Sequence, residues 1–129
     1  MNKDLKKIRK MCALYLVHWE ECVGIDMKSV RYLEGCRTAC SITLTEIETA
    51  DILYGESKEV LCALYDAILA RWCYEFRRKT GNVNATAYSL GLRKSYEKIL
   101  GKTSMIKIRC GIASPAEKEA EERVEKKNV

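Results

Sequence analysis

The stretch KEVLCALYDAILARWCYEFRRK, residues 58–79, decides the fold class of this chain. Smaller apolar residues (Val60, Ala63 and Ala67) widen its apolar stripe, which is typical of a helix buried at the centre of a fold. The last turn is basic, and this charge suits a helix C-terminus. We therefore expect a central helix over residues 58–79. The main apolar residues recur at three- and four-residue steps, and they are Leu61, Leu64, Tyr65, Ile68, Trp72 and Phe76.

The chain before this helix shows similar spacing. Residues 3–23 carry one apolar stripe and are followed by Gly24, so they predict a first helix. Asp26 can cap a second helix, which Gly35 would weaken.

Residues 36–45 fit either a short strand or a helix, because the segment CSITLT is β-branched and alternating. Thr43 followed by Glu46 is a capping-box pattern. We therefore expect a new helix over residues 44–54, ended by Gly55.

The chain after the central helix predicts one more helix and a strand. Asn84 can cap a helix over residues 85–100, turned near Gly91 and closed by Gly101. Residues 105–110 alternate between apolar and basic side chains, which predicts a short β-strand.

These elements together predict an all-α fold, a small bundle of four or five helices with one short β-strand near residues 105–110. The strand would pair with residues 41–45, or with its copy in a second subunit to form a homodimer. We expect residues 1–113 to form a single helical domain and residues 114–129 a charged C-terminal helix or tail. No internal repeat is visible in the sequence.

The composition is that of a folded protein. The 129 residues are 47% apolar and 32% charged, which fits one soluble domain. No stretch reads as a signal peptide or a membrane span, so we expect a cytoplasmic protein without a membrane partner. The seven cysteines are an odd number within helical patterns, and we expect them to be reduced.

Charge is unevenly distributed along the chain. Residues 71–110 hold ten basic residues and two acids, a net charge of +8, whereas residues 20–66 have a net charge of −6. Tyr74, Tyr88 and Tyr96 lie within the basic block and can stack on single-stranded bases, although aromatic residues at helical spacing also fit a buried core. Nine basic residues are expected to contact phosphate groups: Arg77, Arg78, Lys79, Arg93, Lys94, Lys98, Lys102, Lys107 and Arg109.

One segment inside the basic block, ATAYSLGLRKSYEKIL (85–100), resembles the core of a helix-turn-helix. In that motif a small residue, here Ala87, lets two helices approach, and a glycine, here Gly91, takes the turn between them. The resemblance implies a second helix with basic residues facing a DNA groove. The segment departs from the motif at Glu97, where an apolar residue is expected.

Catalytic and metal-binding groups are few. His18 is the only histidine, and no third residue is evident to orient it as a base, so we do not expect an enzyme. His18 with Cys22, Cys36 and Cys40 has spacing that could form a zinc site on two helices, but common zinc motifs use tighter spacing and buried thiols are the favoured explanation of the cysteines. We therefore assign no metal and no cofactor.

The basic block favours a non-enzymatic nucleic-acid-binding protein, with a helix-turn-helix-like regulator as one form. The alternative is an adaptor or inhibitor that binds another protein, or an anionic nucleotide, through the same basic face.

Overall fold

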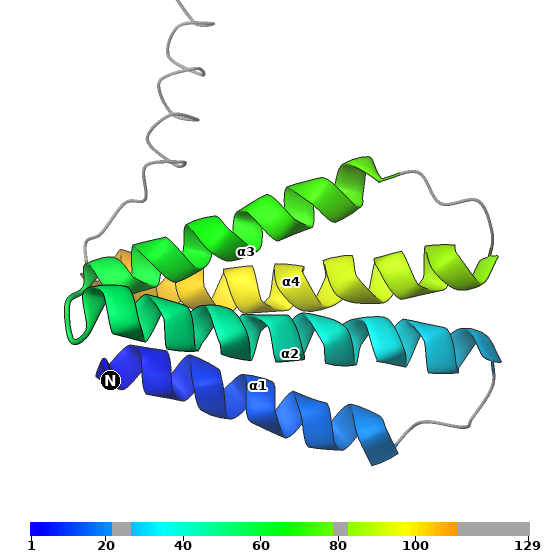
Figure 1. Cartoon of the computed structure of the whole chain (residues 1–129), viewed down its shortest axis with the longest axis horizontal. Coiled ribbons are helices and arrows are strands. Elements are labelled where there is room, and N and C mark those ends of the chain that lie inside the picture. Colours follow the sequence, from blue (N-terminus) through cyan, green and yellow to red (C-terminus); the bar gives the residue numbers. More distant parts are fainter. Residues whose placement is uncertain (22–26, 79–82, 111–129) are drawn as a thin grey trace, which may run out of the picture.

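The computed structural model describes residues 1–21, 27–78 and 83–110, and this part of the chain forms four helices and no strand. They are α1 (Lys3–Glu21), α2 (Met27–Tyr54), α3 (Glu59–Arg77) and α4 (Val83–Cys110) (Figure 1). The predicted all-α bundle is therefore confirmed, as are the first helix and the central helix. The predicted tail, residues 114–129, lies outside the described residues.

The predicted break between two helices in residues 27–54 is wrong, because α2 is continuous. Gly35 does not adopt a positive φ and so does not end the helix. The Thr43 hydroxyl donates to the Ala39 carbonyl at 2.8 Å inside the helix, instead of capping a new one. Gly55, in contrast, has a φ of 59° and follows the last residue of α2, as predicted.

The predicted strand at residues 105–110 is also wrong, because this segment forms the last turns of α4. Gly101 does not close the helix, and Ile106 packs into the core with 4% of its surface exposed. An alternation over six residues fits a helix as well as a strand, and packing against the core decides between them. The strand pairing that suggested a homodimer is lost with it.

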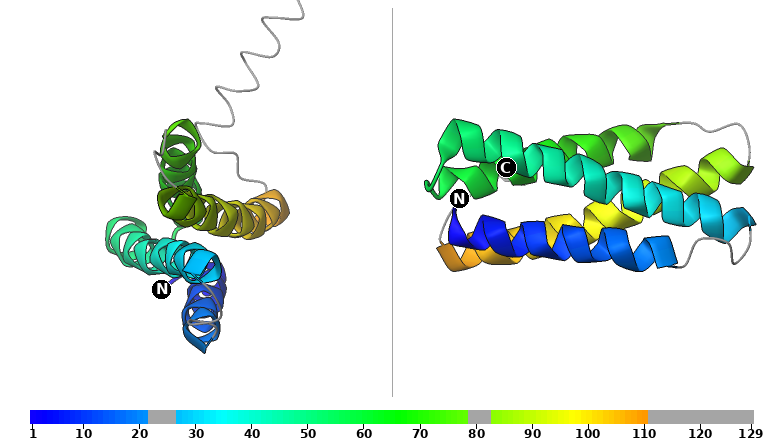
Figure 2. Two further views of the ribbon diagram at one scale, coloured as in Figure 1. Left: turned by 90° about the vertical axis from the view of Figure 1, so that its right-hand side faces the viewer. Right: turned by 60° about the horizontal axis from the view of Figure 1, so that its bottom comes forward.

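The helices run up and down in turn, and α2 and α4 form the centre of the molecule. Both central helices run in the same direction, and α1 and α3 lie on opposite sides of them (Figures 1 and 2). The bundle is therefore flattened, with α2 pressed against α4. None of the helices in the described ranges is long and apolar enough to cross a membrane.

Gly35 of α2 and Gly91 of α4 make this close packing possible. A Cβ atom built on Gly35 would lie 2.1 Å from the carbonyl oxygen of Tyr88, and one on Gly91 would lie 2.1 Å from that of Tyr32. Any side chain at either position would therefore collide with the facing backbone. The Cys36 thiol, next to Gly35, donates across the same crossing to the Gly91 carbonyl at 3.5 Å.

The four helices form a repeat that is only weakly marked in the sequence. The first and last residues of α3 and α4 carry numbers 56 higher than those of α1 and α2, and Gly35 and Gly91 are also 56 apart. The two helical hairpins are thus related by a pseudo-twofold axis between α2 and α4. Buried residues match at this offset: Leu5 with Leu61, Ile8 with Leu64, Cys12 with Ile68, Cys36 with Leu92, Cys40 with Tyr96, Ile47 with Thr103, and Ala50 with Ile106.

Candidate functional site

The nine basic residues predicted to contact phosphate do not form one face. Arg77 and Arg78 lie at the C-terminal end of α3, whereas Arg93, Lys94, Lys98 and Lys102 are spread along α4. Lys107 and Arg109 belong to the last turns of α4, and Lys79 lies outside the described residues. The structure therefore divides the predicted site into two surfaces.

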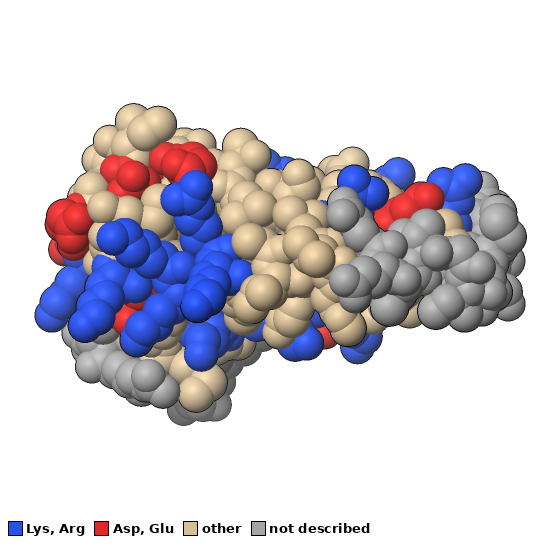
Figure 3. Space-filling view, turned by 90° about the horizontal axis from the view of Figure 1, so that it is seen from below, with Lys and Arg blue, Asp and Glu red and all other residues tan. Residues whose placement is uncertain are grey.

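The first surface joins α4 to α1. The Lys98 ammonium group lies 4.5 Å from the centre of the Tyr15 ring of α1, which brings the two helices together here. Figure 3 shows Lys and Arg side chains gathered at the end of the molecule where α1 begins. We call this surface the lysine face and define it by five exposed residues: Lys3, Lys7 and Lys10 of α1, and Lys98 and Lys102 of α4.

Helical spacing explains the lysine face. Residues 3, 7 and 10 of α1 are four and three positions apart, and residues 98 and 102 of α4 are four apart, so each set shares one side of its helix. One acid, Asp4, lies among them, with its carboxylate 3.9 Å from the Lys7 ammonium group. The α1 lysines were not among the predicted site residues, although the basic start MNKDLKKIRK was the signal for them.

The second surface lies where the C-terminal end of α3 meets the N-terminal half of α4, and its arginines contact neighbouring groups. The Arg93 guanidinium lies 6.0 Å from the centre of the Phe76 ring, and its buried Nε has no hydrogen-bond partner. Arg78 lies 3.6 Å from the Glu75 carboxylate. Gly91 lies inside α4 and makes no turn, so the predicted helix-turn-helix is wrong.

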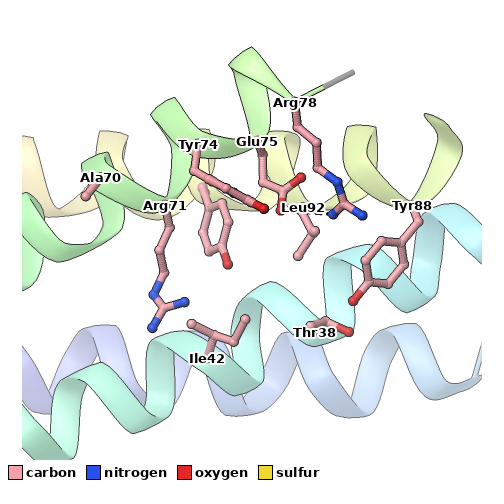
Figure 4. Close-up of a pocket in the computed structure, with 10 residues that line it drawn as sticks. Thr38, Ile42, Ala70, Arg71, Tyr74, Glu75, Arg78, Tyr88 and Leu92 are labelled. Atoms are coloured by element: carbon pink, nitrogen blue, oxygen red, sulfur yellow. Dashed lines mark ion pairs between the residues drawn. The ribbon is translucent and has the colours of Figure 1, made fainter. Parts of the chain in front are cut away.

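A groove between α2 and α3, with α4 as its floor, opens beside this second surface (Figure 4). Its cavity has a volume of about 440 Å³. All three tyrosines singled out in the sequence, Tyr74, Tyr88 and Tyr96, line it together with Arg71 and Arg78. We call it the tyrosine groove. The remaining lining residues are Thr38, Ile42, Ala70, Glu75 and Leu92.

Polar groups in the wall of the tyrosine groove are held in place. The Glu75 side chain is 8% exposed and accepts a hydrogen bond from the Ser89 hydroxyl at 3.1 Å. Arg71 donates from Nε and one Nη to the same Glu46 oxygen, at 3.2 and 2.7 Å. Burial raises the pKa of Tyr96 to about 12, so its hydroxyl stays protonated at neutral pH.

No protein-family model, curated protein or solved structure matches this chain. Its function is therefore inferred from the geometry of the two surfaces.

The residues of the zinc hypothesis do not form a ligand set. Cys36 and Cys40 are buried in the core, whereas His18 is exposed on α1. Cys22 lies outside the described residues. The hydrogen bond with Cys12, together with burial, holds the pKa of the Cys40 thiol above its ordinary value, and burial raises that of Cys36. No group of three potential metal ligands occurs among the residues that the structure describes.

Proposed function

We propose that this protein is a non-enzymatic nucleic-acid-binding protein that contacts phosphate groups through the lysine face. Two observations carry the proposal. Lys and Arg side chains gather at the end of the molecule where α1 begins (Figure 3), and the Lys98 ammonium group of α4 lies 4.5 Å from the centre of the Tyr15 ring of α1. Lysine binds phosphate as a point charge and needs no base contact, so we expect binding with little sequence preference.

The proposal differs from helix-turn-helix recognition. The segment that resembles a helix-turn-helix lies within the single helix α4, so the proposed contacts do not depend on two helices joined at Gly91. Charge attraction on such a face depends strongly on salt, because binding releases counterions from the nucleic acid.

The double variant Lys98→Glu/Lys102→Glu tests the proposal. Both side chains are exposed, so the fold should be retained. We expect the dissociation constant for DNA or RNA to rise about tenfold or more at low salt, and the salt dependence to weaken by about two counterions. Mobility-shift titrations at two salt concentrations measure both quantities.

The matched control for this variant is Arg31→Glu/Arg77→Glu, which reverses two exposed charges near the start of α2 and at the end of α3, at the end of the bundle opposite the start of α1 (Figure 1). It should leave the affinity within about threefold of the wild-type value. Equal weakening by both double variants, or binding that does not change with salt, would contradict the proposal.

The second candidate is an adaptor that binds an acidic protein surface through the same lysines. Three consecutive exposed apolar residues favour it: Ile52, Leu53 and Tyr54 at the end of α2 are 83%, 70% and 45% exposed. Exposed apolar side chains next to charge are common in protein interfaces. This candidate predicts no nucleic-acid binding at low salt and a stoichiometric complex with one protein, weakened by Leu53→Asp.

A further inference from the structure

The tyrosine groove has the size and composition of a small-molecule site. Its volume of about 440 Å³ falls within the range of roughly 300–1,000 Å³ typical of such sites. Ile42, Ala70 and Leu92 supply apolar walls, while two guanidinium groups and one carboxylate converge from α3 (Figure 4). Apolar walls with a few fixed polar groups are what a planar, charged ligand requires.

We infer that the tyrosine groove binds one nucleotide unit, either a free nucleoside monophosphate or an unpaired nucleotide of a single strand. The base would lie among the tyrosines and the phosphate would contact Arg71 or Arg78. The single-strand form rests on the proposed function, whereas binding of the free nucleotide does not.

The tyrosines supply the surface for the base. Tyr74 is 66% exposed at the mouth of the groove, whereas Tyr96 is 2% exposed on its floor. Figure 4 shows the Tyr74 ring on the cavity side of α3, between Arg71 and Arg78. Stacking of a base on an aromatic side chain contributes about 1–3 kcal/mol and tolerates any base.

The arginines supply the contacts for the phosphate. Arg71 and Arg78 are seven residues apart on α3, or about 10 Å along the helix axis. Arg71 uses two of its five N–H donors on Glu46, so donors remain for a phosphate oxygen. The planar guanidinium group suits bidentate contact with phosphate.

Glu75 gives the groove a preference among bases. Its carboxylate is buried in the wall, and one oxygen accepts from Ser89. A carboxylate has about four lone-pair positions, so it can accept further hydrogen bonds. The exocyclic amine of cytosine is such a donor, whereas the matching atom of uracil is an acceptor. We therefore expect cytidine monophosphate to bind more tightly than uridine monophosphate.

Two residues of the tyrosine groove have counterparts at the position related by the pseudo-twofold axis, and these counterparts contact each other. The positions of Ile42 and Arg71 are taken there by Lys98 and Tyr15, 56 residues away in each case, and the Lys98 ammonium lies over the Tyr15 ring. The Lys98 side chain therefore contacts the residue that corresponds to Arg71 of the tyrosine groove. The tyrosine groove has Ile42 instead, which leaves the space beside Arg71 open.

Calorimetric titration of the full chain with cytidine and uridine monophosphate tests the inference. We expect the cytidine nucleotide to bind about tenfold more tightly. Ala70→Phe fills the groove from an exposed position of α3 and should abolish binding. The matched control is Leu14→Phe, at the equivalent exposed position of α1. Glu75→Gln, which presents an amide donor, should reduce or reverse the preference for cytidine.

A second titration separates the free nucleotide from the strand. Single-stranded and duplex oligonucleotides are titrated into wild-type and Ala70→Phe protein. Loss of a single-strand preference in the variant supports the strand form. Nucleotide binding without any oligonucleotide binding supports the groove and overturns the proposed function. Failure of the wild-type protein to bind either nucleotide, together with an unchanged single-strand preference in Ala70→Phe, overturns the inference.

Discussion

Gly35 and Gly91 set the distance between the two central helices. Each lies where the backbone of the facing helix leaves no room for a Cβ atom. In the sequence, both glycines read as helix-breaking residues, because glycine weakens an isolated helix. The structure gives them a different role. Two backbones can approach this closely only where a residue lacks a Cβ atom, and glycine is that residue.

Gly35→Ala or Gly91→Ala should each lower the free energy of unfolding by about 3 kcal/mol or more, because backbone must move away from backbone. The double variant should lower the free energy of unfolding by less than the sum of the two single variants, because moving α2 away from α4 once relieves both collisions. Chemical denaturation followed by circular dichroism measures all three values.

Gly101→Ala is the matched control for the glycine variants. Gly101 lies in α4, and a Cβ atom there would meet nothing within 4 Å. The substitution should raise the stability by about 0.5–1 kcal/mol, the helix propensity gain of alanine over glycine. A loss of stability in Gly101→Ala similar to that in Gly35→Ala would show that close packing of the helices is not the cause of the destabilisation.

Tyr96 should make the fold sensitive to alkaline pH. Burial raises its pKa to about 12 in the folded state, above the ordinary value of 10.0. The folded state therefore keeps a proton that the unfolded state has lost, so the contribution of Tyr96 to the stability is complete below pH 10 and falls as the pH rises from 10 to 12. The expected loss is roughly 2–3 kcal/mol, at 1.36 kcal/mol for each pKa unit.

The measurement for Tyr96 is urea unfolding at a series of pH values. Tyr96→Phe keeps the ring and should flatten the decline between pH 10 and 12. Some decline should remain, because burial also raises the pKa of Tyr32. Tyr54→Phe, at the exposed end of α2, is the control. An unchanged slope in Tyr96→Phe would contradict the assignment.

At the scale of elements, the sequence predicts the helices that carry a clear apolar stripe. The α3 segment is such a case, since its apolar residues recur at three- and four-residue steps along its whole length. The continuity of α2 and α4 was harder to predict from the sequence. The central turns of α2, for example, hold small and β-branched residues such as Ala39 and Thr43. These residues are buried against the facing helix, and this contact stabilises a helix that the local sequence only weakly favours.

Surfaces that join elements distant in sequence could not be predicted. The block from residue 71 to 110 was identified by charge, yet Arg93 points toward Phe76 while Lys98 points toward Tyr15. The helical period sends these neighbours to different sides of α4. The lysines of α1 and the cavity shared by three tyrosines depend on which helices are adjacent, and that information enters only with the fold.

At the scale of the whole molecule, the repeat of two hairpins explains why the bundle is flattened. Each hairpin buries its long helix against the long helix of the other, with a glycine at the crossing. Most matched core positions keep burial but not residue identity, as Cys40 and Tyr96 illustrate, whereas Leu5 and Leu61 are identical. The shared sequence around the crossing is short, Tyr-x-x-Gly-x-Arg at residues 32–37 and 88–93, so the repeat is evident mainly in the packing.

The repeat predicts that the order of the hairpins can be exchanged. The start of α1 and the end of α4 lie at the same end of the bundle (Figure 1), and the ammonium group of Met1 lies 2.9 Å from Glu56 in the turn after α2. A circular permutant that begins at Glu56, continues through residues 111–129 to Met1, and ends at Gly55 should fold with the same helix content. The loss of the ion pair between the Met1 ammonium group and Glu56 should cost about 1 kcal/mol, because the Glu56 carboxylate is 79% exposed.

A permutant opened between Ser41 and Ile42 is the control, because that cut divides α2 beside its crossing with α4. We expect it to lose cooperative unfolding, since the two halves of α2 can no longer hold Gly35 against α4. Thermal unfolding by circular dichroism compares the two permutants. If the permutant opened at Glu56 also failed to fold while the cut within α2 was tolerated, the hairpins would not be the units that pack, and the pseudo-twofold relation would be only geometrical.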